Sequence, residues 1–329
     1  MLAILGVTFP FFALVLCGYV AARREMLPLA AIPGLNSFVL YFALPAMLYR
    51  YSAQTPIAEL LDTALLSVYL LVAAIMIMLT IMVTKRGRIG WNDAALGALV
   101  ATFPNVGFMG VPMLVALLGE VAAGPIIVLL AADMVVTSSV CIALSRRDGD
   151  AETATLPPAR RLRLALGKAL RSVLGNPMAW SMVLGALASA TGLHLPAALD
   201  KTVALLGNAA SPVALFTIGA VLARANMVAG QGRHGHGGWR GVWPVALFKL
   251  VLHPLLAFGM GKAAQAAGLP LSDAVMSVMT LAAALPSASN VALLAERLGA
   301  DTARIARIIL LTTVAAFGSF TLLAGWMKG

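Results

Sequence analysis

Long apolar runs alternate with short charged or turn-rich stretches along almost the whole chain. Reading between those stretches gives ten apolar segments of about 20 residues or more, the length that a helix needs to cross a bilayer. The sequence therefore predicts ten transmembrane helices. Their expected ranges are 1–22, 32–51, 61–84, 93–118, 122–145, 172–192, 199–223, 241–267, 272–295 and 303–326.

The composition supports a membrane protein. Of the 329 residues, 61% are hydrophobic and only 11% are charged, and the mean hydropathy is +0.94. Soluble domains are about half apolar and about one quarter charged, and they avoid large exposed apolar surfaces. We therefore expect an all-α integral membrane fold in the lipid bilayer. The first apolar run has no basic region before it and no clear cleavage site, so we expect it to be retained as a span.

The formal net charge of +10 would suggest nucleic acid as a partner of a soluble protein, but here it is explained by topology. Of the 23 Lys and Arg residues, 18 follow odd-numbered spans, four follow even-numbered spans, and Lys249 lies within the eighth. Because cytoplasmic loops collect positive charge, this asymmetry predicts both termini on the non-cytoplasmic side of the cell inner membrane.

A hydrophilic stretch divides the chain near its middle. We expect a first five-helix repeat over residues 1–145, a cytoplasmic linker over 146–171 and a second five-helix repeat over 172–329. Because five is odd, a duplicated half would insert upside down relative to the first. The sequence thus predicts two inverted repeats, an architecture common among secondary transporters.

Helix-breaking residues recur in matching spans of the two halves. Spans 2 and 7 each carry a proline, and spans 4 and 9 each combine proline with asparagine. Such breaks free backbone polar groups, which in hydrocarbon must be satisfied by protein or water. We interpret the fourth, seventh and ninth spans as interrupted, with a substrate cavity at spans 4 and 9; the alternative is that the prolines only kink packed helices. The substrate-binding candidates are Pro104, Asn105, Gly107, Pro286 and Asn290.

The motifs together resemble those of the auxin efflux carrier family, and of its prokaryotic members in particular. They are Leu44-Pro45-Ala46, Asn176-Pro177, Pro212 with Leu215-Phe216 and Gly219, and the pair Pro104-Asn105 and Pro286 with Asn290. The resemblance implies the fold of bile acid:sodium symporters, with a scaffold bundle and a transport bundle whose fourth and ninth helices cross at the substrate site. It also implies an organic-anion permease, since prokaryotic members are commonly described as malonate carriers and plant members export auxin. One departure is that Asn105 follows its proline directly, whereas Asn290 comes four residues after Pro286.

Two ionisable residues lie within apolar spans, where such groups suggest function. Asp133 in the fifth span is a candidate for binding a coupling proton or Na⁺, and the alternative is a neutral carboxyl that joins two helices. Lys249 in the eighth span, with His253 at i+4, is a secondary candidate for attracting an anion, but snorkelling to the headgroups or a structural pairing is favoured. Asn208 is another secondary candidate, with helix capping as its alternative.

Other chemistry finds little support. His234 and His236 lie in a glycine-rich loop without nearby cysteine or carboxylate, so no metal site is predicted, and Cys17 and Cys141 are interpreted as packing residues. No nucleotide-binding or common hydrolase motif occurs, so neither a cofactor nor catalytic residues are expected. A homodimer is one oligomeric state that the sequence leaves open.

The sequence therefore favours a secondary transporter of a small organic anion, such as malonate or another carboxylate, that works by an elevator-like motion. The alternative from another class is a membrane-embedded enzyme acting on a lipid-linked substrate, which should cluster acidic or nucleophilic residues near an interface. A channel is disfavoured because no ring of repeated polar residues marks a filter.

Overall fold

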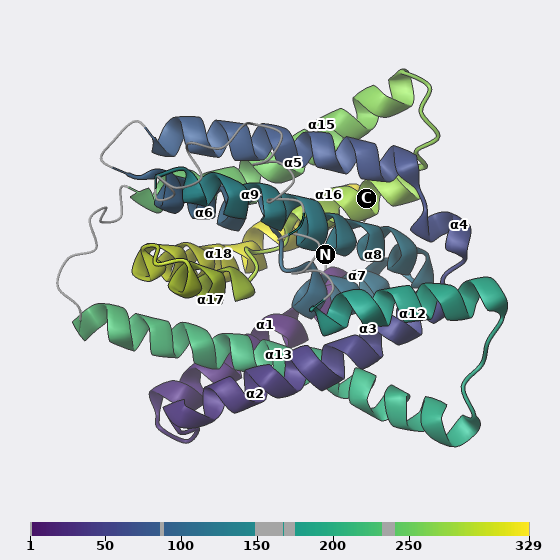
Figure 1. Cartoon of the computed structure of the whole chain (residues 1–329), viewed down its shortest axis with the longest axis horizontal. Coiled ribbons are helices and arrows are strands. Elements are labelled where there is room, and N and C mark those ends of the chain that lie inside the picture. Colours follow the sequence, from purple (N-terminus) through teal and green to yellow (C-terminus); the bar gives the residue numbers. More distant parts are fainter. Residues whose placement is uncertain (1, 86–88, 149–166, 168–174, 232–240, 329) are drawn as a thin grey trace.

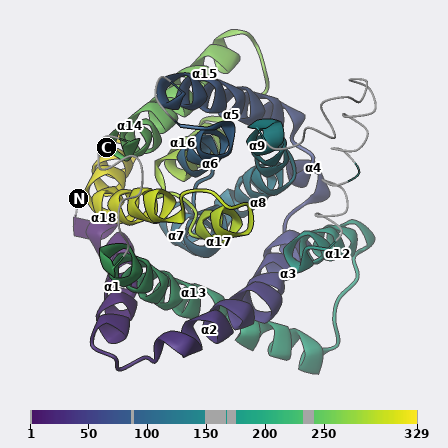
Figure 2. The same cartoon turned by 60° about the vertical axis from the view of Figure 1, so that its left-hand side comes forward.

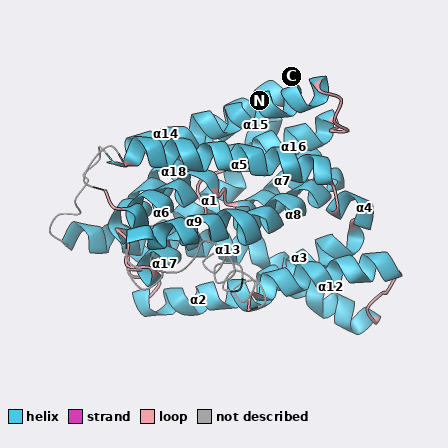
Figure 3. Ribbon diagram, turned by 45° about the horizontal axis from the view of Figure 1, so that its top comes forward, coloured by secondary structure: helices cyan, strands magenta, loops and turns pink. Residues whose placement is uncertain are grey.

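A computed structural model describes residues 2–85, 89–148, 167, 175–231 and 241–328. These residues are almost entirely helical and form no strand (Figure 3). Seven helical segments among them are long and apolar enough to cross a membrane. The predicted all-α integral membrane protein is therefore confirmed. The seven segments are Leu2–Arg23, Leu29–Gln54, Ile57–Thr84, Glu120–Ser145, Ala197–Arg224, Trp243–Ala266 and Thr302–Met327.

Several of the helices are joined end to end through short 3₁₀ or π-helical turns. In the first part of the chain the elements are α1 Leu2–Arg23, η1 Leu29–Ala31, α2 Ile32–Phe38, η2 Val39–Ala43, α3 Leu44–Gln54, α4 Ile57–Leu60, α5 Thr63–Thr84, α6 Trp91–Thr102, η3 Val106–Gly110, α7 Val111–Leu118, η4 Glu120–Ala122, α8 Ala123–Ala132, η5 Asp133–Thr137, α9 Ser138–Ser145 and η6 Arg146–Asp148. In the second part they are α12 Pro177–Thr191, α13 Ala197–Gln231, α14 Trp243–Leu247, η8 Phe248–Leu252, α15 His253–Ala266, α16 Asp273–Ala284, α17 Asn290–Arg297 and α18 Thr302–Lys328.

The helices form two groups that pack against each other (Figure 1). The first group consists of α1, α2, α3, α12 and α13, in which α13 packs along both α1 and α3 and α12 packs along α3. Figure 2 shows it as an arc along one side of the molecule. The second group contains α5 to α9 and α14 to α18, with close pairs α5–α6, α6–α9 and α15–α16. Each group combines helices from both parts of the chain.

Glycines allow the backbones of α1 and α13 to approach closely. A Cβ atom on Gly18 would overlap the backbone carbonyl of Phe216, and one on Gly219 would overlap that of Val15. Small residues at such positions are the usual means by which membrane helices pack, since lipid offers no hydrophobic drive for association. The first group is therefore held by backbone contact that larger side chains would break.

The prolines of spans 2 and 7 both lie within continuous helical segments. The π-helical turn η2 leads directly into α3, where Pro45 occupies a first-turn position that needs no backbone N–H donor. Helix α13 runs without a break from Ala197 to Gln231 with Pro212 inside it. The predicted interruption of the seventh span is wrong, because a long helix packed on α1 and α3 accommodates one missing hydrogen bond.

Three of the predicted spans are not represented by a single long helix. The segments 93–118 and 272–295 are each divided into shorter helices, and α12 covers 15 residues of the expected 172–192. The count of ten spans and their inverted arrangement therefore stay predictions. Most of the expected linker 146–171, together with His234 and His236, lies outside the described residues.

Candidate functional site

Two segments of the second group lose helical structure in mid-course. Helix α6 ends at Thr102, and helical structure resumes at Val106 after an extended Phe103. Helix α16 ends at Ala284, and α17 begins at Asn290 after an extended Leu285. These are the interruptions expected in spans 4 and 9, and each contains one of the candidate prolines, Pro104 or Pro286.

The two interruptions lie against each other, and their backbones are hydrogen-bonded. Pro104 and Ser287 form an isolated antiparallel bridge. The Asn105 N–H donates to the Pro286 carbonyl at 2.8 Å, and the Ala288 N–H donates to the Phe103 carbonyl at 3.0 Å. Polar backbone groups freed by the breaks thus satisfy one another, which explains how non-helical chain is tolerated at this depth.

We call the contact between these two interruptions, residues 103–105 and 285–289, the crossing. Ser287 attaches the crossing to the neighbouring helices. Its hydroxyl donates to the carbonyl of Val100 on α6 at 2.7 Å. Its backbone N–H donates to the Thr312 hydroxyl on α18 at 3.3 Å. Ser287 is 1% exposed. The crossing is therefore fixed within the second group.

Both candidate asparagines stand at the start of a half-helix. Asn105 immediately precedes η3 and α7, and Asn290 is the first residue of α17. Asn105 is thus the N-cap residue of its half-helix, whereas Asn290 lies one position further on, after the N-cap residue Ser289. The Oδ1 atoms of both side chains are buried without a hydrogen-bond partner in the described part of the chain, as is the Thr102 hydroxyl. Buried polar atoms usually have a hydrogen-bond partner, so these three residues are candidates for contact with a polar ligand.

The glycines after Asn105 serve packing more than cavity formation. A Cβ on Gly110 would come within 2.9 Å of Leu285 in the other interruption. A Cβ on Gly107 would meet Leu130 of α8 at an ordinary 3.6 Å. Gly107 therefore borders α8, whereas Gly110 permits the close contact between the two interruptions.

Asp133 is completely buried and connects two helices of the second group. Its carboxylate accepts hydrogen bonds from the Tyr69 hydroxyl on α5 at 2.6 Å and from the Thr137 hydroxyl at 2.9 Å. Its own carbonyl, at the start of the π-turn η5, accepts a hydrogen bond from the Ser138 hydroxyl on α9 at 2.8 Å. The structural role that the sequence allowed is therefore present. A carboxyl with two hydroxyl partners in the interior is also suited to binding a cation or a proton.

Lys249 is also completely buried, so the snorkelling interpretation is wrong. Its Nζ atom lies 3.0 Å from His253 Nδ1 and donates to the Ala283 carbonyl at 3.0 Å. Ala283 is in the last turn of α16, just before the crossing. Lys249 interacts electrostatically with Asp133, but no direct ion pair joins the two among the described residues. The contacts instead favour a structural pairing, which the sequence offered beside snorkelling.

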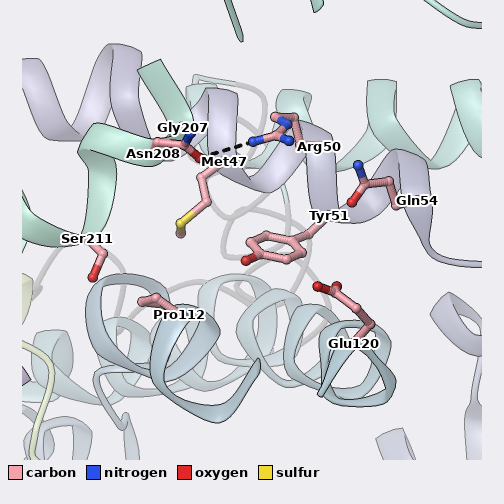
Figure 4. A pocket seen from close by; sticks show the side chains of 9 residues that line it. All are labelled: Met47, Arg50, Tyr51, Gln54, Pro112, Glu120, Gly207, Asn208 and Ser211. Atoms are coloured by element: carbon pink, nitrogen blue, oxygen red, sulfur yellow. Dashed lines mark hydrogen bonds between the residues drawn. The ribbon is translucent and has the colours of Figure 1, made fainter. Parts of the chain in front are cut away.

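Asn208 is neither at the crossing nor a helix cap. It lies inside α13 and accepts a hydrogen bond from Arg50 Nη1 on α3 at 3.2 Å. Both side chains line a cavity of about 460 Å³ between the two helix groups, together with Tyr51, Glu120 and Ser211 (Figure 4). The charge count placed Arg50 with the basic residues that follow the second span, so the sequence did not predict this cavity, although a basic residue near the end of an apolar span was a usable signal. The structure shows no group of metal-ligating side chains among the residues it describes.

Comparison with known proteins agrees with a transport role. A family model described as membrane transport protein matches residues 3–324. The chain is 28% identical to a Rhizobium meliloti protein named "Putative malonate transporter", over 98% of this chain and 95% of that protein. It is 27% identical to an uncharacterized transporter of Escherichia coli, over 91% and 89% of the two chains. It is 20% identical to auxin efflux carrier component 8 of Arabidopsis thaliana, over 86% of each. The chain therefore belongs to the membrane transport protein family, the family of the auxin efflux carriers.

Proposed function

We propose that this protein is a secondary transporter of a small organic anion such as malonate, and that the anion binds where the two interrupted segments cross. The observation that carries this proposal is the pair of buried amide oxygens without a hydrogen-bond partner, on Asn105 and Asn290, at the start of two half-helices. The similarity to a protein named as a malonate transporter supports a carboxylate as the substrate class.

The chemistry of the crossing suits an anion. The N-terminal end of a helix carries partial positive charge and N–H groups that lack intrahelical partners. A side-chain amide can turn end for end and present its NH₂ group as a donor. Asn105 and Asn290 then add donors beside the two helix ends, with no formal positive charge that would hold the substrate too tightly to release.

The division into two groups supports an alternating-access motion. We propose ten spans in two inverted five-helix repeats, with the first group as the scaffold and the second as the transport bundle. Both candidate asparagines belong to the second group, whereas α1 and α13 of the first are locked by their glycines. An elevator-like displacement of the second group would carry the site across the inner membrane as a unit, with both termini on the non-cytoplasmic side.

We propose further that Asp133 couples transport to a proton or to Na⁺. Its carboxylate lies in the second group, and its hydrogen-bond partners are hydroxyls, which carry no compensating charge. Transport is favoured over lipid-linked enzyme chemistry because the polar side chains of the two interruptions and of Asn290 are amides and hydroxyls, with no acid or base among them.

Uptake of radiolabelled malonate into proteoliposomes tests the proposal. We expect saturable uptake that an imposed proton or Na⁺ gradient increases. Asn105→Ala and Asn290→Ala should each lower uptake efficiency by about tenfold or more, because each removes a buried hydrogen bond to a charged ligand. Asn36→Ala, on α2 in the first group, is the matched control and should transport normally. Uptake unchanged in both site variants would reject the crossing as the binding site.

A further inference from the structure

The cavity between the two helix groups contains a basic side chain that the transport proposal does not use. We call this cavity the vestibule; its polar lining consists of Arg50, Tyr51, Gln54, Glu120, Asn208 and Ser211. It has a volume of about 460 Å³, which corresponds to on the order of fifteen water molecules at roughly 30 Å³ each. A small dicarboxylate with several waters fits this space. Neither Asn105 nor Asn290 is among its lining residues.

Arg50 is held in place but lacks a counter-ion. Its Nη1 atom donates to Asn208 Oδ1 at 3.2 Å, which fixes the guanidinium against α13. Its Nε atom is buried without a hydrogen-bond partner. Within the part of the chain that the structure describes, no carboxylate lies within 4.0 Å of Arg50. The Arg50 guanidinium has five N–H donors, and thus only part of them have hydrogen-bond acceptors.

An arginine in this position favours an anionic ligand. A charge near the hydrocarbon region is costly without a partner of opposite sign, and a guanidinium matches a carboxylate through two parallel hydrogen bonds. In Figure 4 the ring of Tyr51 extends from α3 toward the middle of the vestibule, and Ser211 lies on α13 at its far side. Both hydroxyls can donate to the same ligand.

We propose that the vestibule is a second anion site, in which Arg50 binds a carboxylate of the substrate before it reaches the crossing. Asn208, a secondary substrate-binding candidate from the sequence, acts here as a positioning residue for the guanidinium. The identity of the anion rests on the proposed transport function, but the site itself rests on the cavity and on the unpaired arginine. The two ideas can therefore fail separately.

Glu120 sets the strength of this site. It lies on the wall opposite Arg50, on η4 of the second group, and is exposed (Figure 4). Its negative charge opposes an anion in the vestibule, so binding should be weak enough for the substrate to move on. Neutralising Arg50 and neutralising Glu120 should thus have opposite effects on affinity. A role of either residue in folding alone would not produce this opposition.

Cysteine protection measures occupancy of the vestibule directly. The experiment uses the full-length Ser211→Cys variant in a Cys17→Ser, Cys141→Ser background and an uncharged thiol reagent. Malonate at ten times its Kd should slow labelling of this cysteine about tenfold by occupying the site. Malonamide, a neutral molecule of nearly the same shape, should not protect. Labelling that is equally fast with and without malonate would overturn the proposal.

Charge variants in the same background identify the ligand of the anion. Arg50→Gln should raise the malonate concentration that gives half-protection by about tenfold, since it removes a charge-assisted bidentate contact. Glu120→Gln should lower that concentration, and it keeps the test open if Arg50→Gln does not fold. Arg24→Gln, which removes the same charge outside the vestibule, is the matched control and should change nothing. If neither Arg50→Gln nor Glu120→Gln shifts half-protection, Arg50 is not the anion ligand.

Combining protection with uptake separates this inference from the transport proposal. In Asn105→Ala the vestibule should still be protected by malonate, while uptake is lost. If malonate protects Ser211→Cys but uptake does not depend on Asn105 or Asn290, the crossing is rejected as the binding site and the vestibule site is supported. If uptake depends on both asparagines but malonate does not protect Ser211→Cys, the vestibule site is rejected and the crossing is supported.

Discussion

Lys249 donates a hydrogen bond of 3.0 Å to the carbonyl oxygen of Ala283, in the last turn of the half-helix α16. In a continuous helix this carbonyl would accept from the backbone N–H four residues later, at Ser287, but that N–H donates to Thr312. The buried amino group of Lys249 thus replaces the missing helical partner at the end of α16. The break in α16 is therefore stabilised from a different helix.

Replacing Lys249 tests this capping role. Lys249→Met should lower the free energy of unfolding by about 1–3 kcal/mol, because the Ala283 carbonyl is left buried without a donor. Thermal unfolding of the purified protein in detergent measures the loss. Lys262→Met is the matched control: Lys262 pairs with Asp273 at 3.3 Å on the surface, where ion pairs contribute little. Equal stability of the two variants would show that the cap has no energetic weight.

The Asp133 carboxyl can be tested for coupling apart from packing. Asp133→Asn should abolish accumulation of malonate against its gradient while downhill exchange across proteoliposomes continues, because the amide cannot be ionised. Tyr69→Phe keeps the carboxyl and removes only the 2.6 Å hydrogen bond, so accumulation should persist with a stability loss of about 1 kcal/mol. Accumulation at the normal level in Asp133→Asn would leave Asp133 with its structural role alone.

Backbone contact between α1 and α13 should not tolerate a methyl group. Gly219→Ala places a Cβ where the Val15 carbonyl lies, and overpacking of this kind destabilises by about 1–3 kcal/mol. The yield of monodisperse protein and its unfolding temperature report the effect. A Cβ on Gly259 meets nothing within 4 Å, so Gly259→Ala should be neutral or slightly stabilising in its helix. Identical behaviour of the two variants would contradict close packing of α1 on α13.

The crossing itself depends on Ser287. Ser287→Ala removes the donor to the Val100 carbonyl on α6, which is buried at the end of a half-helix. We expect a loss of about 1–2 kcal/mol in stability and a lower maximal uptake rate, since the two interruptions would be less well aligned. Thermal unfolding and initial uptake rates measure both effects. Normal values of both quantities would mean that the backbone bridge holds the crossing without this side chain.

The sequence by itself was enough to predict a location in the lipid bilayer, an all-α fold and the family. Apolar runs long enough to span a bilayer can only be buried in lipid, so helix was the only regular structure open to them. The interruptions at Pro104 and Pro286 were also readable, because proline removes a donor wherever it stands. Span length and hydropathy are local properties, whereas a proline marks a break only where neighbouring segments supply other hydrogen-bond partners.

Only the tertiary structure decided which polar groups meet. Pro212 looked like a break but lies inside a continuous helix, because packing on neighbouring helices outweighs one lost hydrogen bond. Arg50 donates a hydrogen bond to Asn208, which lies 158 positions later in the sequence, and both residues line the vestibule. Hydrogen-bond partners and cavities depend on how helices are placed side by side, and hydropathy carries no information about that placement. The two interruptions could be predicted from the sequence, but the backbone hydrogen bonds between them could not.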